Sequence, residues 1–189
     1  GDFLSIDFNS VLVQVVAIEK NNATIRVING GLIGSNKAVT INRDINLPPL
    51  TEKDQQAIKV GREKGINCFA LSFANSAMDV QLIRNLAGHS ATIISKIESR
   101  RGLSNLEEIS NESDALLVDR GDLSREIPLE KIPVAQKMII SNARKLGKKG
   151  YVATNLLESM VSSSVPTRAE VNDIYNTLLD GASGLVLAA

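Results

Sequence analysis

The stretch DALLVDRGD, residues 114–122, joins a short apolar run directly to a cluster of charges. An apolar run of this length is typical of a strand that is buried on both faces of a parallel sheet. The residues Asp119, Arg120, Gly121 and Asp122 then lie where that strand would end. Ligands bind at the carboxyl ends of parallel strands, so the stretch predicts a fold and a site together.

Four further apolar runs follow the same pattern, with amphipathic stretches between them. The runs are INCFALSF (66–73), ATIISKI (91–97), GYVAT (150–154) and SGLVLA (183–188). Apolar residues recur at helical spacing over 132–146 and over 171–182. Strands that alternate with helices predict an α/β fold in which helices cover a parallel sheet. Two arrangements satisfy this pattern, a doubly wound open sheet and a (β/α) barrel.

The first 45 residues have a different composition, which is typical of β structure. Asn21 and Asn22 supply turn chemistry between two runs of apolar and β-branched residues. We expect NGGLIG (29–34) to form a hairpin turn, because no helix opens after these glycines as a dinucleotide-binding loop requires. The residue pattern changes after residue 45 from β-rich to alternating strands and helices. This change predicts a β domain over 1–45 and an α/β domain over 46–189.

Helix starts are also predicted from capping residues. The expected pairs are Thr51 with Asp54, Ser104 with Glu107, and Thr167 with Glu170.

The composition excludes several classes of partner. The chain has 21 basic and 21 acidic residues, so no overall charge attracts nucleic acid or an anionic membrane. The apolar runs are too short to span a bilayer. We therefore expect neither nucleic acid nor a membrane as a partner. The one cysteine, Cys68, is expected to be a buried free thiol, and the absence of a second cysteine favours a reducing compartment.

Polar residues recur at the predicted strand ends, at Ser72, Lys96, Glu98, Asp122 and Thr154. Each alone has an ordinary structural explanation, but together they indicate a ligand or metal site. Glu98 and Asp122 offer the hard oxygen ligands that suit Mg²⁺ or Mn²⁺. Lys96 is two residues from Glu98, so both side chains point to one side of the strand. A cation beside a divalent metal indicates phosphoryl transfer.

Several longer segments resemble consecutive blocks of the pyruvate kinase family. They are NLPPLTEKD (46–54), SKIESRRGLSNLEEI (95–109), VDRGDLSREIPLEKIPVAQKMII (118–140), ATNLLESM (153–160) and PTRAEVNDIYNTLLDGASGLVLAA (166–189). The resemblance implies a partial TIM (β/α)8 barrel that holds strands four to eight, preceded by the end of a small β-barrel lid domain. It implies transfer of a phosphoryl group from phosphoenolpyruvate to ADP, which gives pyruvate and ATP.

The resemblance also implies a role for each site residue. Lys96 would stabilise the phosphoryl group in flight, and Glu98 and Asp122 would ligate Mg²⁺ or Mn²⁺. The N–H groups of Gly121 and Asp122 would bind the substrate carboxylate, and Thr154 would help to deliver a proton. Ser72 would line the site. The resemblance further implies a K⁺ ion as a second cofactor and a homo-oligomeric full-length protein. It also implies a cytoplasmic location, with a plastid as the alternative.

The sequence departs from the family pattern at several positions. Asp119 stands where the family usually has a small residue, and Ser124 and Arg125 replace less polar residues. Asn155 ends the ATN motif, and 7–9 read Asp-Phe-Asn where the lid usually has an acidic pair and a glycine. Two alternatives therefore stay open, a divergent metal-dependent aldolase or lyase of the phosphoenolpyruvate/pyruvate barrel type and a non-catalytic regulatory module. We expect the chain to be a fragment that is inactive alone.

Overall fold

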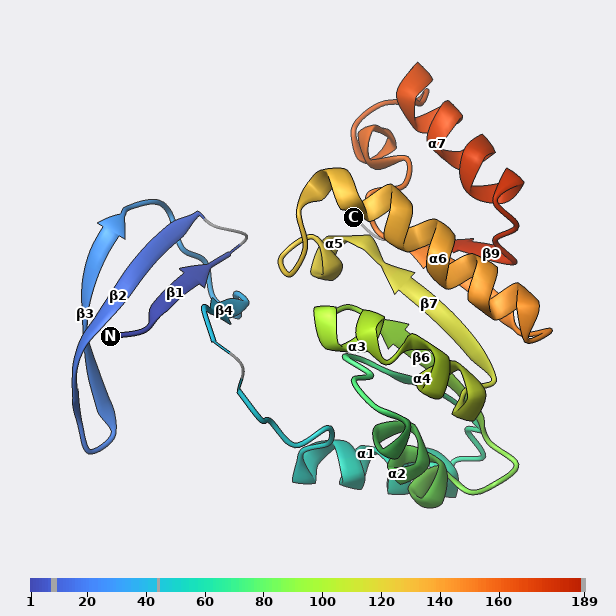
Figure 1. The fold of residues 1–189 in the computed structure, drawn as a ribbon, viewed down its shortest axis with the longest axis horizontal. Coiled ribbons are helices and arrows are strands. Elements are labelled where there is room, and N and C mark those ends of the chain that lie inside the picture. Colours follow the sequence, from blue (N-terminus) through green and yellow to red (C-terminus); the bar gives the residue numbers. More distant parts are fainter. Residues whose placement is uncertain (8–9, 44, 188–189) are drawn as a thin grey trace. The chain divides into compact units, whose positions relative to one another are not determined.

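A computed structural model describes residues 1–7, 10–43 and 45–187. The chain divides into two compact units, Gly1–Leu47 and Pro48–Ala189 (Figure 1). The division falls two residues after the expected boundary at residue 45. Phe8 and Asn9, two residues of the unusual lid motif, lie outside the described residues.

The first unit is an antiparallel sheet of four strands in the order β3-β2-β1-β4. The strands are β1 (Phe3–Ile6), β2 (Val11–Glu19), β3 (Asn22–Asn29) and β4 (Val39–Ile41). A turn connects the paired strands β2 and β3 as predicted, but it lies at Lys20 and Asn21, and Asn22 is the first residue of β3. The hairpin predicted at NGGLIG is wrong, because β3 and β4 lie at opposite edges of the sheet. Gly31 is needed there for a close approach, since a Cβ atom would lie 2.4 Å from the Ser10 carbonyl oxygen.

The second unit contains a parallel sheet of five strands in the order β5-β6-β7-β8-β9. The strands are β5 (Cys68–Leu71), β6 (Thr92–Ile97), β7 (Ala115–Asp119), β8 (Lys149–Ala153) and β9 (Gly184–Val186). All five apolar runs thus form strands, as predicted. Each strand pairs with the one before it in the sequence, so the order never reverses as it does in a doubly wound sheet.

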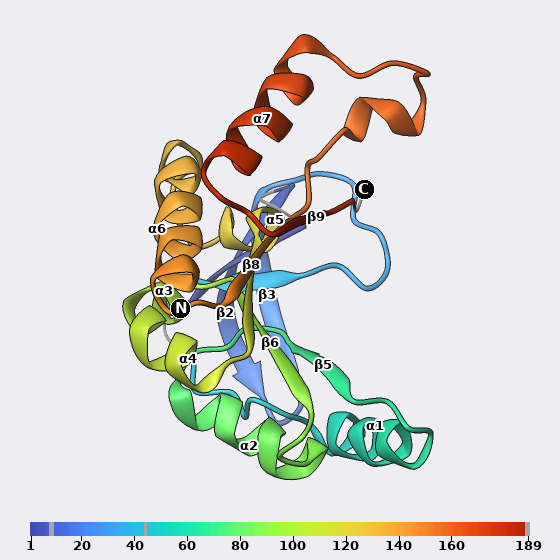
Figure 2. The ribbon, with the colours of Figure 1, turned by 90° about the vertical axis from the view of Figure 1, so that its right-hand side faces the viewer.

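Helices connect these strands. They are α1 (Glu52–Glu63), α2 (Ala77–Ala87), α3 (Arg100–Ser104), α4 (Leu106–Glu112), α5 (Arg120–Leu123), α6 (Ile132–Lys145) and α7 (Arg168–Leu179), with short 3₁₀ turns at Leu129–Lys131 and Glu158–Val161. Figure 2 shows α2, α4 and α6 on the same side of the strands. Buried residues such as Ile93, Leu116 and Val152 pack there against helix residues such as Val80 and Ile139. Among the described residues, no helix combines the length and the apolar composition needed to cross a membrane.

Two of the three predicted helix starts are confirmed. Complete capping boxes form at Thr51 with Asp54 and at Thr167 with Glu170. The box predicted at Ser104 is wrong, because Ser104 is the last residue of α3. The helix begins earlier than expected. Its N-cap is Ser99, whose side chain accepts a hydrogen bond from the Gly102 N–H at 2.9 Å.

The expectation that Cys68 is buried is also wrong, although the thiol is free as predicted. Cys68 begins β5, which is the edge strand of the described sheet. All five residues of β7, in the middle of the sheet, are buried, whereas only Leu71 is buried in β5. An apolar run at an edge has a neighbour on one side only, so apolar composition alone does not predict its burial.

Candidate active site

The register of the parallel sheet brings the predicted strand ends together. Lys96 and Ile97 of β6 lie opposite Leu117 and Val118 of β7. Asp119, the last residue of β7, lies opposite Ala153 of β8. The next residues along β6 and β8 are Glu98 and Thr154. They therefore flank Asp119 at the carboxyl ends of the strands, where the polar residues were predicted to gather.

Lys96 and Glu98 form an ion pair in this cluster. The Lys96 Nζ atom lies 2.6 Å from Glu98 Oε1, and the Glu98 side chain is fully buried. The backbone N–H of Phe73 donates to Glu98 Oε2 at 2.6 Å. Burial raises the pKa of Glu98, and its bonds to Lys96 and Phe73 only partly oppose that effect. Burial alone would lower the pKa of Lys96, but the carboxylates of Glu98 and Asp119 raise it above its ordinary value.

Asp119 occupies a central position in the cluster, although it is not among the residues predicted to form the site. Its Oδ2 atom lies 3.1 Å from Lys96 Nζ. Its Oδ1 atom accepts a hydrogen bond from the Thr154 hydroxyl at 3.2 Å and a longer one from the Asp122 N–H at 3.4 Å. The signal that could have drawn attention to Asp119 is a charged residue directly after an apolar run, at the predicted strand end.

Gly121 and Asp122 lie in the short helix α5 that follows β7. The Gly121 N–H donates to the Thr154 hydroxyl oxygen at 2.8 Å, and the Asp122 N–H donates to Asp119. Both N–H groups predicted to bind a substrate carboxylate thus make bonds within the protein. The Asp122 Oδ1 atom accepts a hydrogen bond of 2.6 Å from Arg125.

The two predicted metal ligands lie close together, with a third carboxylate beside them. Glu98, Asp119 and Asp122 each offer one carboxylate oxygen, and these three atoms lie within 4.8 Å of one another. A set of hard oxygen donors at this spacing fits Mg²⁺, which takes one or two carboxylates and leaves its other positions to water and substrate.

Arg120 holds the ends of β7 and β8 in place. Its guanidinium donates to the carbonyl oxygens of Thr154 and Asn155 at 2.8 and 2.9 Å. It also makes two bonds of 2.9 Å to the carboxylate of Asp173 in α7. Thr154 and Asn155 have positive φ angles of 67° and 53°, which are rare for a β-branched residue such as threonine. Arg120 therefore stabilises a strained backbone that directs the Thr154 hydroxyl into the cluster.

Ser72 lies at the end of β5, where it was predicted, and is exposed. Its neighbour Phe73 makes the contacts with the cluster instead. The Phe73 backbone is left-handed, with φ of 51°, and its N–H bonds to Glu98. Its ring also lies under the Arg125 guanidinium, 5.8 Å from the ring centroid.

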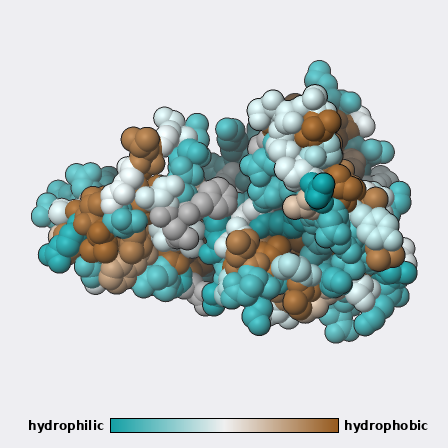
Figure 3. All heavy atoms as spheres, turned by 90° about the horizontal axis from the view of Figure 1, so that it is seen from above, coloured by the Kyte–Doolittle hydropathy of each residue, from teal (hydrophilic) through white to brown (hydrophobic). Residues whose placement is uncertain are grey.

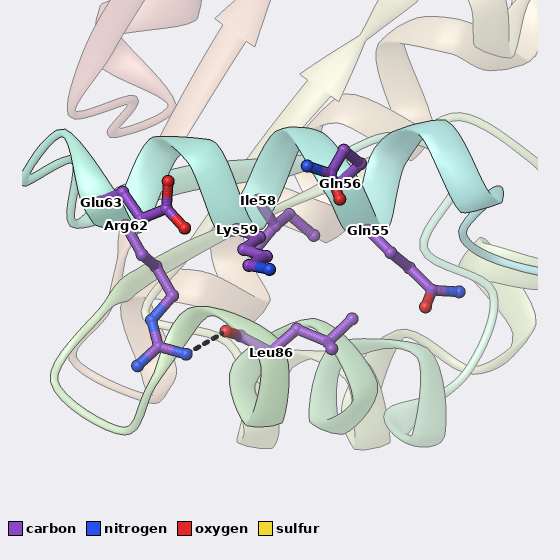
Figure 4. Close-up of a pocket in the computed structure, with 7 residues that line it drawn as sticks. All are labelled: Gln55, Gln56, Ile58, Lys59, Arg62, Glu63 and Leu86. Atoms are coloured by element: carbon purple, nitrogen blue, oxygen red, sulfur yellow. Dashed lines mark hydrogen bonds between the residues drawn. The ribbon is translucent and has the colours of Figure 1, made fainter.

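A separate pocket of about 710 Å³ lies between α1 and α2. Figure 4 shows that its lining residues come from the outer helices, with Arg62 donating to the Leu86 carbonyl oxygen at 2.9 Å. None of the predicted site residues lines this pocket. The titratable groups gather at the strand ends instead, which makes that cluster the candidate active site.

Comparison with known proteins gives the family. The model of the pyruvate kinase barrel domain matches residues 1–189. The chain is 38% identical over 192 residues to a pyruvate kinase of Agaricus bisporus, covering 100% of this chain and 36% of the relative. It is 39% identical over 193 residues to a pyruvate kinase of Clostridium acetobutylicum, covering 100% of this chain and 41% of the relative. The chain thus spans about two fifths of the length of the curated relatives it matches. The chain belongs to the pyruvate kinase family.

Proposed function

We propose that the full-length protein transfers the phosphoryl group of phosphoenolpyruvate to ADP, which gives pyruvate and ATP. The observation that carries the proposal is the position of Lys96, whose ammonium lies 2.6 Å from Glu98 and 3.1 Å from Asp119 at adjacent strand ends. The chemistry needs a fixed positive charge where charge develops on the transferring phosphoryl group. The family assignment favours this reaction over an aldolase, a lyase or a regulatory module.

Each residue has a distinct role in the proposed reaction. Lys96 neutralises charge on the phosphoryl group while it moves from the enol oxygen to ADP. The Thr154 hydroxyl lies beside the enolate and helps to deliver the proton that converts it into pyruvate. The N–H groups of Gly121 and Asp122 bind the substrate carboxylate, for which they exchange or share their bonds to Thr154 and Asp119.

Glu98 and Asp122 would hold the divalent cation, Mg²⁺ or Mn²⁺. When bound, the ion supplies Lewis-acid stabilisation of the developing negative charge. The burial of Glu98 and the short distances among the carboxylates support this assignment. A K⁺ ion is a further proposed cofactor.

The five strands in order fit strands four to eight of a (β/α)8 barrel, which three further strands of the full-length protein would close. The first unit fits part of a lid domain. Its sheet is incomplete as a folded unit, because every residue of β3 is exposed. Large apolar side chains such as Ile18, Val27 and Leu32 are exposed as well, and Figure 3 shows hydrophobic residues on the surface of this unit. We further propose that Ser72 lines the site and that the full-length protein is a cytoplasmic or plastid homo-oligomer.

The test is turnover of phosphoenolpyruvate with ADP and Mg²⁺ by the full-length protein, with and without the substitution Lys96→Met. We expect the wild type to be active and the variant to lose at least about 100-fold in kcat, because a preorganised charge at the reacting group is lost. The matched control is Lys137→Met in α6, where the side chain is 64% exposed and its ammonium pairs with Asp180 at 3.2 Å. This control should keep wild-type turnover.

Two outcomes would contradict the proposal. A Lys96→Met variant as active as the control would remove Lys96 from the reaction. A wild type that binds Mn²⁺ but shows no turnover would favour the regulatory module or the divergent enzyme.

A further inference from the structure

The carboxylate of Asp119 connects two side chains from the strands on either side of β7. Its Oδ2 atom lies 3.1 Å from the ammonium of Lys96, which belongs to β6. Its Oδ1 atom lies 3.2 Å from the hydroxyl of Thr154, which follows β8. Asp119 is only 7% exposed, so its charge is held inside the protein.

Helix capping does not explain a buried charge at this position. Asp119 is the N-cap residue of α5, but the bond from the Asp122 N–H is 3.4 Å long and the helix has only four residues. Asparagine caps a helix as well as aspartate does, without a charge to desolvate. A buried carboxylate is costly unless cations or donors compensate it. The ammonium of Lys96 is the compensating cation here.

The carboxylate limits the freedom of both partners. Lys96 carries a compact ammonium on a flexible four-carbon stem, and Glu98 alone fixes it from one side only. Asp119 fixes it from a second side. The Thr154 hydroxyl accepts from the Gly121 N–H at 2.8 Å, and its one hydrogen can go to Asp119 or to the Ala153 carbonyl oxygen at 2.7 Å. Asp119 therefore influences where the hydroxyl hydrogen points.

We propose that Asp119 is a positioning residue that sets the separation and orientation of the Lys96 ammonium and the Thr154 hydroxyl. This inference rests on the proposed function. In that reaction the bond from phosphorus to the enol oxygen breaks, the bond from phosphorus to a terminal oxygen of ADP forms, and a proton joins the enolate carbon. Asp119 makes and breaks no bond. It acts through Lys96 in the first step and through Thr154 in the second.

The test compares steady-state kinetics of the full-length wild type with Asp119→Asn. The variant keeps the cap and the side-chain volume and removes the charge. We expect kcat to fall by about 10- to 100-fold, because even a small misplacement of the reacting groups lowers the rate by about this much. We expect KM for phosphoenolpyruvate to stay the same or fall, because one negative charge leaves a site that binds an anion. The Tm should change by less than about 3 °C.

The matched control is Asp114→Asn, at the opposite end of the same strand. Asp114 accepts from the Ile93 N–H at 2.7 Å and pairs with Arg84 at 2.9 Å, so it too is an ion-paired carboxylate. This control should keep the wild-type kcat and KM, because Asp114 contacts no member of the proposed site.

The results separate the role of Asp119 from the proposed function itself. Wild-type kcat in Asp119→Asn overturns the role of Asp119 alone, as does a fall in kcat that comes with a raised KM and a lowered Tm. If Asp119→Asn does not fold, Asp119→Ser is tested, since serine also caps helices; two unfolded variants make Asp119 structural and overturn the proposal. A wild type without turnover overturns the proposed function and the role of Asp119 with it.

Discussion

Lys96 faces more negative charge than its single ammonium can balance. Glu98 and Asp119 both lie within ion-pair distance of it, at 2.6 and 3.1 Å. The third carboxylate, Asp122, pairs with Arg125 at 2.6 Å. Three carboxylates beside two cations leave the cluster net negative, so a divalent cation held there would complement its charge.

The contribution of Glu170 to the stability of the protein depends on pH. Its carboxylate accepts bonds from the side chain and N–H of Ser159 at 2.5 and 2.8 Å and from the N–H of Thr167 at 2.7 Å. These bonds lower the pKa of Glu170 to about 2. A carboxylate with a lowered pKa in the folded state stabilises the protein above its ordinary pKa of 4.5, and that contribution is lost as the pH falls towards about 2.

We therefore expect Glu170→Gln to be less stable than the wild type at neutral pH, with the difference shrinking between pH 4.5 and about 2. The measurement is the urea midpoint of both full-length proteins across this range. Glu107→Gln is the control, because the capping box predicted there does not form. A gap between wild type and Glu170→Gln that is constant with pH would show that the carboxylate charge contributes nothing.

At the scale of elements, the C-terminus of α4 depends on a lysine from the loop before β8. The Lys148 Nζ atom donates to the carbonyl oxygens of Ser110, Asn111 and Ser113 at 2.5, 2.7 and 2.6 Å. These carbonyls lie at or just beyond the helix end, where groups lack partners within the helix and a positive charge is favourable.

Substituting Lys148→Met should therefore lower the stability of the full-length protein by about 1 to 3 kcal/mol, since partly buried carbonyls lose their donor. Lys145→Met, at the exposed C-terminal residue of α6, is the control and should change stability by less than about 0.5 kcal/mol. Urea unfolding of both variants makes the comparison, and equal midpoints would mean that water replaces the lysine without cost.

The elements also show which features a sequence can predict. Apolar runs and helical spacing predict strands and helices because they reflect burial on one or both faces. Turn residues at NGGLIG predict a change of direction but not which strand lies next, so the hairpin was wrong there. Polar strand ends predict the cluster, since parallel strands end together. The contacts of Asp119 depend on register and side-chain direction, which no local pattern specifies.

At the scale of the whole molecule, helices cover one face of the sheet, and the other face is exposed at β5. Along β5, Phe69 and Leu71 pack towards the helices with the core, whereas Cys68 and Ala70 are exposed. Alternate residues of a strand point to opposite faces, so Cys68 and Ala70 share the face away from the helices, as Lys96 does in β6. In a closed barrel this face becomes the interior, and further strands would pair with the open edge of β5.

Closure of the barrel should therefore protect Cys68 in the full-length protein. We expect a maleimide to label it at least about tenfold more slowly in the native protein than in urea, because a thiol must be exposed to react. The control is Met78→Cys in α2, where the side chain is 76% exposed on the helical layer. That thiol should be labelled at similar rates in both conditions, with each site followed by peptide mass spectrometry. Rapid labelling of Cys68 in the native protein would mean that β5 stays at an open edge, and the proposal of a closed eight-stranded barrel would then fail even if the strand-end cluster proved catalytic.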